Sequence, residues 1–144
     1  LRDIQAVIRT LDPLDGALEF LNELRRACQV IILSDTFYEF ADPLMEKLER
    51  PTLFCNKLVV NGDGMVVDYK LRQKDGKRMA VKALHTLQFK VVASGDSYND
   101  TGMLSEADAG VLFCPPDNVI REFPQFPVTR TYAELREQID KHIG

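Results

Sequence analysis

Residues 91–101 read Val-Val-Ala-Ser-Gly-Asp-Ser-Tyr-Asn-Asp-Thr, the most informative stretch of the sequence. A short apolar run stops at Gly95, and Asp96, Asn99 and Asp100 follow directly. Ligands bind beyond the carboxyl ends of strands in parallel α/β sheets, and carboxylate and amide oxygens suit a hard cation such as Mg2+. This stretch therefore predicts a buried strand followed by a ligand site. The alternative is a polar turn in which Asn99 or Asp100 caps the next helix.

Two further segments place polar side chains next to a predicted strand or helix. Residues 30–36, Val-Ile-Ile-Leu-Ser-Asp-Thr, form another apolar run that ends in a hydroxyl and a carboxylate. Between the two runs, Lys74-Asp75-Gly76-Lys77 directly precedes a helical pattern. Lys77 fits the first turn of that helix better than Lys74, because apolar residues follow it at the helical spacing of +3, +4 and +7. The alternative for either lysine is a solvated surface charge.

A strand ending in Ser, a Lys at a helix start and a strand ending in Gly-Asp-x-x-Asn-Asp resemble motifs II, III and IV of the haloacid-dehalogenase-like phosphohydrolases. Within that family, several longer stretches look like the bifunctional phosphoserine phosphatase/homoserine phosphotransferase subgroup, and the similarity spans essentially the whole chain. These stretches are Ile-Leu-Ser-Asp-Thr-Phe-Tyr-Glu-Phe (32–40), Leu-Arg-Gln-Lys-Asp (71–75), Gly-Asp-Ser-Tyr-Asn-Asp-Thr (95–101) and Asn-Val-Ile-Arg-Glu-Phe-Pro-Gln-Phe-Pro (118–127).

The resemblance implies hydrolysis of a small phosphomonoester through an aspartyl-phosphate, with phosphoserine as substrate and homoserine as an alternative acceptor. It assigns catalytic roles to Lys77 and Ser34. It assigns substrate contacts to Ser34, Asp35, Lys77 and Asn99. A different phosphomonoester within the same family is the nearest alternative, and a non-catalytic α/β module that binds a partner is the other.

The same resemblance implies a Mg2+ cofactor. Its ligands would be Asp96 and Asp100, and Asp100 would orient either the metal's waters or Lys77. The alternatives are a capping role for Asp96 and a helix N-cap role for Asp100.

The family's motif I, an apolar strand ending in Asp-x-Asp or Asp-x-Glu, has no counterpart in the sequence. Asp12-Pro13-Leu14-Asp15-Gly16 has the acidic spacing, but no apolar strand precedes it. The chain also begins with Leu1. We therefore expect the carboxyl-terminal part of a longer protein, whose other part holds the nucleophile, the general acid and most of the cap. In the family topology, the motif I strand lies between strands 29–34 and 90–94, so the isolated chain is expected to be inactive and poorly stable.

Composition sets further bounds. The 144 residues suffice for one domain, and we assign 1–144 to a single core domain in which 1–14 end the cap. A net charge of −4 gives no reason to expect nucleic acid or an anionic membrane as partner. No apolar run approaches the roughly 20 residues of a membrane span. Three cysteines without Cys-x-x-Cys spacing favour a reducing cytoplasm.

Hydrophobic periodicity predicts alternating strands and helices, and therefore an α/β fold with a doubly wound parallel sheet of the Rossmann type. An antiparallel hairpin is inserted, with positive φ expected at both glycines of Asn61-Gly62-Asp63-Gly64. The predicted helices are 2–11, one opening at Asp15-Gly16, 37–48 with Pro43 inside it, 77–88, 101–107, 117–123 and 132–143. The predicted strands are 29–34, 52–55, 57–60, 65–69, 90–94 and 109–113.

Overall fold

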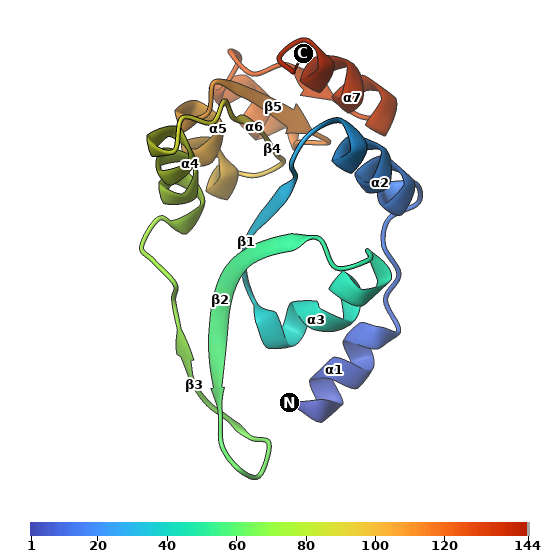
Figure 1. The fold of residues 1–144 in the computed structure, drawn as a ribbon, viewed down its shortest axis with the longest axis vertical. Helices are drawn as coiled ribbons and strands as arrows, with labels where there is room; N and C mark the ends of the chain where they lie inside the picture. The colour runs from blue at the N-terminus through green and yellow to red at the C-terminus, as the bar shows by residue number, and fades with distance from the viewer. Residues whose placement is uncertain (144) are drawn as a thin grey trace. The chain divides into compact units, whose positions relative to one another are not determined.

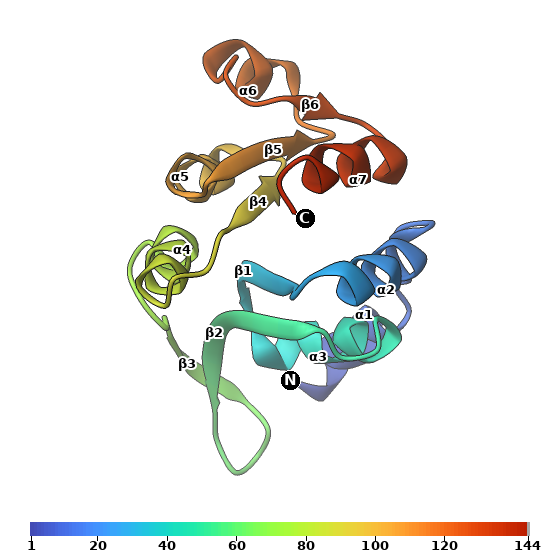
Figure 2. The ribbon, with the colours of Figure 1, turned by 45° about the horizontal axis from the view of Figure 1, so that its top comes forward.

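The computed structural model describes residues 1–143, which form two compact units. The N-terminal unit comprises Leu1–Gly76 and the C-terminal unit begins at Lys77. Each unit contains a three-stranded sheet, with strand order β1-β2-β3 in the first (Figure 1) and β4-β5-β6 in the second (Figure 2). Among residues 1–143, no helix is long and apolar enough to cross a membrane.

The N-terminal unit combines helices with a mixed sheet. Its elements are α1 (Arg2–Arg9), α2 (Ala17–Ala27), β1 (Ile31–Phe37), α3 (Tyr38–Lys47), β2 (Thr52–Val60) and β3 (Val66–Lys70). β1 and β2 are parallel, whereas β2 and β3 form an antiparallel hairpin. α3 packs against β1 and β2, and α1 packs against α3 (Figure 1).

The C-terminal unit has a wholly parallel sheet. Its elements are α4 (Gly76–Thr86), β4 (Val92–Gly95), a 3-10 helix η1 (Tyr98–Asp100), α5 (Thr101–Glu106), β5 (Ala109–Phe113), α6 (Asp117–Glu122), β6 (Val128–Thr129) and α7 (Tyr132–Asp140). α5 lies beside β4 and β5, and α7 lies beside β5 and β6 (Figure 2). These pairings confirm the predicted α/β class with parallel strands and a hairpin.

The best-buried part of the molecule is the centre of the parallel sheet. Val111 and Leu112 are successive residues of β5, and so point to opposite faces, yet both are almost completely buried. A central parallel strand covered on both faces needs such a continuous apolar run. The sequence predicts no strand at β6, a pair of residues after Pro127. Its Thr129 is buried, and its hydroxyl is satisfied there by donating to the carbonyl oxygen of Leu112 at 2.7 Å.

The first strand differs from the prediction. We expected it to end at Ser34, but β1 continues to Phe37. Regular pairing with β2 stops at Leu33 and resumes only at Phe37, so Ser34, Asp35 and Thr36 form an irregular stretch. Side chains replace the lost ladder bonds there. Ser34 Oγ accepts the N–H of Thr36 at 3.2 Å, and Asn56 Nδ2 donates to the carbonyl oxygen of Asp35 at 3.1 Å.

Two predictions about the hairpin were wrong. The predicted strands 52–55 and 57–60 are one strand, β2, because its first half pairs with β1 and its second half pairs with β3. Only Gly64 has a positive φ, of 80°, whereas Gly62 does not. The side chain of Asn61 holds the backbone of the turn instead, because its Oδ1 accepts the N–H groups of Asp63 and Met65, each at 3.0 Å.

Pro43 lies inside α3, as the sequence predicts. A proline has no N–H, so the carbonyl oxygen four residues earlier loses its helical partner. That oxygen belongs to Glu39, and Gln5 of α1 donates its Nε2 hydrogen to it at 2.9 Å. A side chain of a neighbouring helix therefore completes the hydrogen bonding of α3.

Candidate active site

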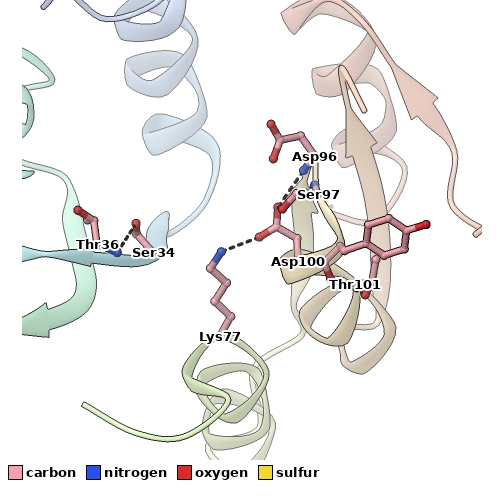
Figure 3. A network of polar contacts seen from close by, with 8 residues as sticks. Ser34, Thr36, Lys77, Asp96, Ser97, Asp100 and Thr101 are labelled. Carbon is pink, nitrogen blue, oxygen red and sulfur yellow. Dashed lines mark hydrogen bonds and ion pairs between the residues drawn. The ribbon is translucent and has the colours of Figure 1, made fainter. Parts of the chain in front are cut away.

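The central polar contact of the C-terminal unit joins α4 to the turn after β4. Lys77 lies in the first turn of α4, and its Nζ lies 2.8 Å from Asp100 Oδ1 (Figure 3). The two side chains are only 16% and 10% exposed. An ion pair of this kind is costly to desolvate, and removing one partner strongly destabilises the fold because the other charge is left buried and unpaired. Its partial burial therefore distinguishes Lys77 from an ordinary surface lysine.

The other carboxylate oxygen of Asp100 holds the turn. Oδ2 accepts the N–H groups of Asp96 at 2.9 Å and Ser97 at 3.3 Å (Figure 3). Ser97 is also the N-cap of η1, in a reciprocal capping box with Asp100. The carboxylate thus fixes the backbone of the turn with one oxygen and the ammonium group of Lys77 with the other.

Asp100 is ionised in this environment. Burial by itself would raise the pKa of Asp100, but the hydrogen bond from Lys77 and the N–H groups of Asp96 and Ser97 outweigh it and lower that pKa below its ordinary value. The ion pair is therefore intact at neutral pH, where the side chain of Lys77 is held in a fixed direction.

Asp96 and Asn99 lie in the same turn, but both residues are exposed. The backbone of Asp96 is tied to Asp100, whereas its carboxylate has no hydrogen bond or ion pair with residues 1–143. No cluster of three His, Cys, Asp or Glu side chains within the described part of the chain could hold a metal. Mg2+ is commonly bound by one or two carboxylates together with waters and substrate phosphate oxygens. The open carboxylate of Asp96 fits such a partial ligand set.

Ser34 and Asp35 belong to the N-terminal unit, in the irregular stretch of β1. Ser34 is half-buried and its hydroxyl oxygen accepts a hydrogen bond from Thr36, while Asp35 is exposed. The structure thus brings Lys77, Asp96 and Asp100 together within one unit. The predicted convergence of Ser34 with them stays a prediction.

The alternative lysine lies elsewhere. Lys74 precedes α4 and is exposed, whereas Lys77 sits within the helix. Two residues of the site were not predicted from the sequence. Ser97 caps η1, and Gly95 lacks a side chain and so leaves room for Asp100. The spacing Ser-x-x-Asp is a capping-box pattern and could have identified Ser97.

The sequence profile described as haloacid dehalogenase-like hydrolase matches residues 1–108. Together with the α/β fold and the site geometry, this match places the chain in the haloacid dehalogenase-like hydrolase family.

Within this family, the chain is similar to two curated bacterial proteins. A phosphoserine phosphatase of Pseudomonas syringae pv. tomato is 59% identical over 141 residues, which cover 98% of this chain and 60% of the relative. The phosphoserine phosphatase ThrH of Pseudomonas aeruginosa is also 59% identical over 141 residues, covering 98% of this chain and 69% of that protein. The chain therefore spans about three fifths to two thirds of the length of these relatives.

Solved structures share the fold. A phosphoserine phosphatase in apo form superposes with a TM-score of 0.73 and 27% identity, over 95% of this chain and 70% of that chain. A substrate-bound phosphoserine phosphatase complex gives a TM-score of 0.74 and 25% identity, over 91% of this chain and 66% of that chain. These similarities agree with the family assignment made from sequence.

Proposed function

We propose that this chain forms part of a phosphomonoesterase that hydrolyses phosphoserine through an aspartyl-phosphate. The observation that carries the proposal is the partly buried Lys77–Asp100 ion pair beside the Gly-Asp-x-x-Asn-Asp turn. The named activity of the relatives at 59% identity supports the choice of phosphoserine.

In this proposal Lys77 neutralises charge on the transferring phosphoryl group. Phosphoryl transfer depends mainly on positioning and on stabilising the negative charge of the equatorial oxygens. An ammonium group held by Asp100 is already in place and needs no reorganisation during the reaction. Asp100 therefore acts as a positioning residue for Lys77, and its second oxygen keeps the turn of Asp96 in shape.

We propose Asp96 as the carboxylate ligand of a Mg2+ ion. When bound, Mg2+ would supply positive charge to the phosphoryl oxygens. Both oxygens of Asp100 already accept hydrogen bonds, from Lys77 and from backbone N–H groups, so Asp96 is the open carboxylate of the pair. Asp100 would contribute to the metal site through the turn that it holds, and it would orient the waters of the ion.

Three further residues are proposed to contact substrate. Ser34 would donate its hydroxyl hydrogen to a phosphoryl oxygen, and Asn99 would donate its amide hydrogens. Asp35 would accept a hydrogen bond from the amino group of phosphoserine. Water is the proposed acceptor of the phosphoryl group, and homoserine is the proposed second acceptor on the strength of the sequence resemblance.

We propose that residues 1–144 by themselves do not hydrolyse phosphoserine. Among residues 1–143, no strand leads into an Asp-x-Asp or Asp-x-Glu sequence that could present a nucleophile and a general acid. We also propose a cytoplasmic location, because the three cysteines of the sequence lack Cys-x-x-Cys spacing, and an odd number of them favours a reducing compartment over a disulfide framework.

The test uses the protein as its gene encodes it, with phosphate release from phosphoserine measured across a Mg2+ titration. Asp96→Asn should weaken Mg2+ binding, observed directly by calorimetry, and lower turnover. Asp117→Asn makes the same change at an exposed residue of α6 and should alter neither quantity. Unchanged Mg2+ affinity in Asp96→Asn would remove that residue from the metal site. Release of phosphate by residues 1–144 alone would contradict the need for an outside nucleophile.

A further inference from the structure

β3 forms one edge of the N-terminal sheet and is unusually open for a strand. Every residue of β3 is exposed, and large apolar side chains stand out on it: Val67 is 58% exposed, Tyr69 59% and Leu71, just beyond the strand, 61%. Within residues 1–143, no strand pairs with its outer edge. An exposed apolar edge strand is a template for pairing with another strand.

The backbone of Tyr69 points out of this edge. Residues of an antiparallel pair alternate between those that exchange hydrogen bonds and those whose N–H and C=O groups point away. Tyr69 lies opposite Leu58 of β2. The N–H of Leu58 donates instead to Glu39 Oε2 at 3.0 Å, and the N–H of Tyr69 donates to Asp68 Oδ1 at 2.8 Å. Leu58 and Tyr69 are therefore the non-bonded pair, and the backbone groups of Tyr69 point outward. To pair with another strand, the N–H of Tyr69 must exchange its bond to Asp68 Oδ1 for one across the interface.

β3 carries opposite charges on the two sides of Tyr69, so an antiparallel copy of the strand would be complementary to it. Asp68 and Lys70 flank Tyr69 and lie on the same face of the strand. Lys70 stands directly opposite Lys57 of β2, and like charges in opposed positions destabilise a sheet. A negative charge on the outer side of Lys70 would offset that repulsion.

We propose that a second copy of this chain pairs its β3 antiparallel with this edge, about a two-fold axis at Tyr69. In that register Tyr69 exchanges two backbone hydrogen bonds with Tyr69 of the partner subunit. Asp68 lies opposite Lys70 of the partner subunit, and the symmetry repeats this opposite-charge pair. An isologous interface requires such a self-complementary pattern.

The neighbouring registers are disfavoured. An axis at Asp68 would set two aspartates opposite each other, and the backbone groups of Asp68 face β2. An axis at Val67 would fall on the bulge, because the pairing of β3 with β2 shifts between Asp68 and Val66. In the register centred on Tyr69, the aromatic rings of both copies extend an apolar face on which Tyr69 already packs edge-on against Phe37, with ring centroids 6.2 Å apart.

The proposal is tested by sedimentation equilibrium of the protein as its gene encodes it. We expect a dimer. Asp68→Lys and Lys70→Asp should each raise the dimer dissociation constant by about tenfold or more, because each places two like-charge pairs across the axis. The double variant, which swaps the charges, should restore the dimer. Asp63→Lys makes the same charge change in the hairpin turn and should leave the dissociation constant unchanged.

A covalent trap gives a second measurement. Residues that exchange hydrogen bonds across antiparallel strands have Cα atoms about 5.5 Å apart, within reach of a disulfide. Tyr69→Cys should form a disulfide-linked dimer on mild oxidation, whereas Met65→Cys, at the far end of the hairpin, should not. A monomer at all concentrations overturns the proposal. A dimer that tolerates Asp68→Lys also overturns it, and so does a dimer that the charge swap fails to restore. Either result would mean that another strand or segment covers β3.

Discussion

Gly95 and Asp100 lie in such close contact that one added methyl group could not fit between them. A Cβ atom built on Gly95 would lie 2.5 Å from the Cβ, Cγ and Oδ2 atoms of Asp100. The glycine is therefore the residue that lets the carboxylate reach both the N–H of Asp96 and the ammonium group of Lys77.

Gly95→Ala should displace the carboxylate of Asp100 and weaken its contact with Lys77. We expect a loss of about 2–3 kcal/mol in the free energy of unfolding, the scale of an overpacked buried site, measured by urea denaturation. Gly62→Ala is the matched control, because nothing lies within 4 Å of a Cβ at Gly62. Equal effects of the two substitutions would show that the turn can adjust without cost.

Asp100→Asn should lower the free energy of unfolding at neutral pH. It should also make that free energy vary less with pH. The folded-state pKa of Asp100 is lowered, so its stabilising contribution is complete above the unfolded pKa of about 3.9 and is lost as the pH falls through the folded value. We expect the variant to be about 3 kcal/mol less stable at pH 7, as for a broken buried ion pair.

The corresponding measurement is urea unfolding of both proteins between pH 7 and pH 3. The difference between wild type and Asp100→Asn should shrink as the pH falls below about 4. Other carboxylates titrate in both proteins and cancel in the difference. A difference that stays constant with pH would mean that the charge of Asp100 does not stabilise the fold. Asp63→Asn, in an exposed turn, serves as the control.

Gln5→Ala should leave the carbonyl oxygen of Glu39 without its partner and cost about 1 kcal/mol of stability. The cost should diminish when Pro43 is replaced by alanine, because an N–H at that position can donate to the same oxygen. A double-mutant cycle measured by thermal or urea unfolding gives the coupling between the two residues. Additive effects would contradict the explanation of how α3 tolerates its proline.

Lys77→Ala should lower turnover about a hundredfold, or roughly 3 kcal/mol, because it removes charge from the phosphoryl group in the transition state. Lys74→Ala should have almost no effect, since Lys74 is exposed and precedes α4. Steady-state kinetics with phosphoserine should place the loss mainly in kcat rather than KM. A larger loss for Lys74→Ala would show that the two lysines have been assigned the wrong way round.

The sequence predicted the elements whose local patterns are strong. The helical spacing after Lys77 placed α4 within one or two residues of its observed bounds, and the apolar run before Gly95 identified β4. The predicted strand 109–113 coincides with β5. Such segments are apolar or amphipathic over their whole length, so hydrophobic periodicity alone locates them.

The elements predicted incorrectly depend on partners that are distant in the sequence. β1 extends beyond Ser34 because Asn56 of β2 donates a hydrogen bond to the carbonyl oxygen of Asp35 in its irregular stretch. β2 is continuous because β1 and β3 each pair with one half of it. β6 exists because Val128 and Thr129 pair with Leu112 and Phe113 of β5.

Short motifs in a recognisable order were enough to predict the family, the α/β class and the candidate residues Lys77, Asp96 and Asp100. The contacts that each of these side chains makes could be seen only in the folded chain. A carboxylate has two oxygens and can bind only groups that the fold brings to it. The packing of α4 beside the turn after β4 directs one oxygen of Asp100 to Lys77 and the other to the backbone. The carboxylate of Asp96 stays open because no described side chain lies where it could pair with it.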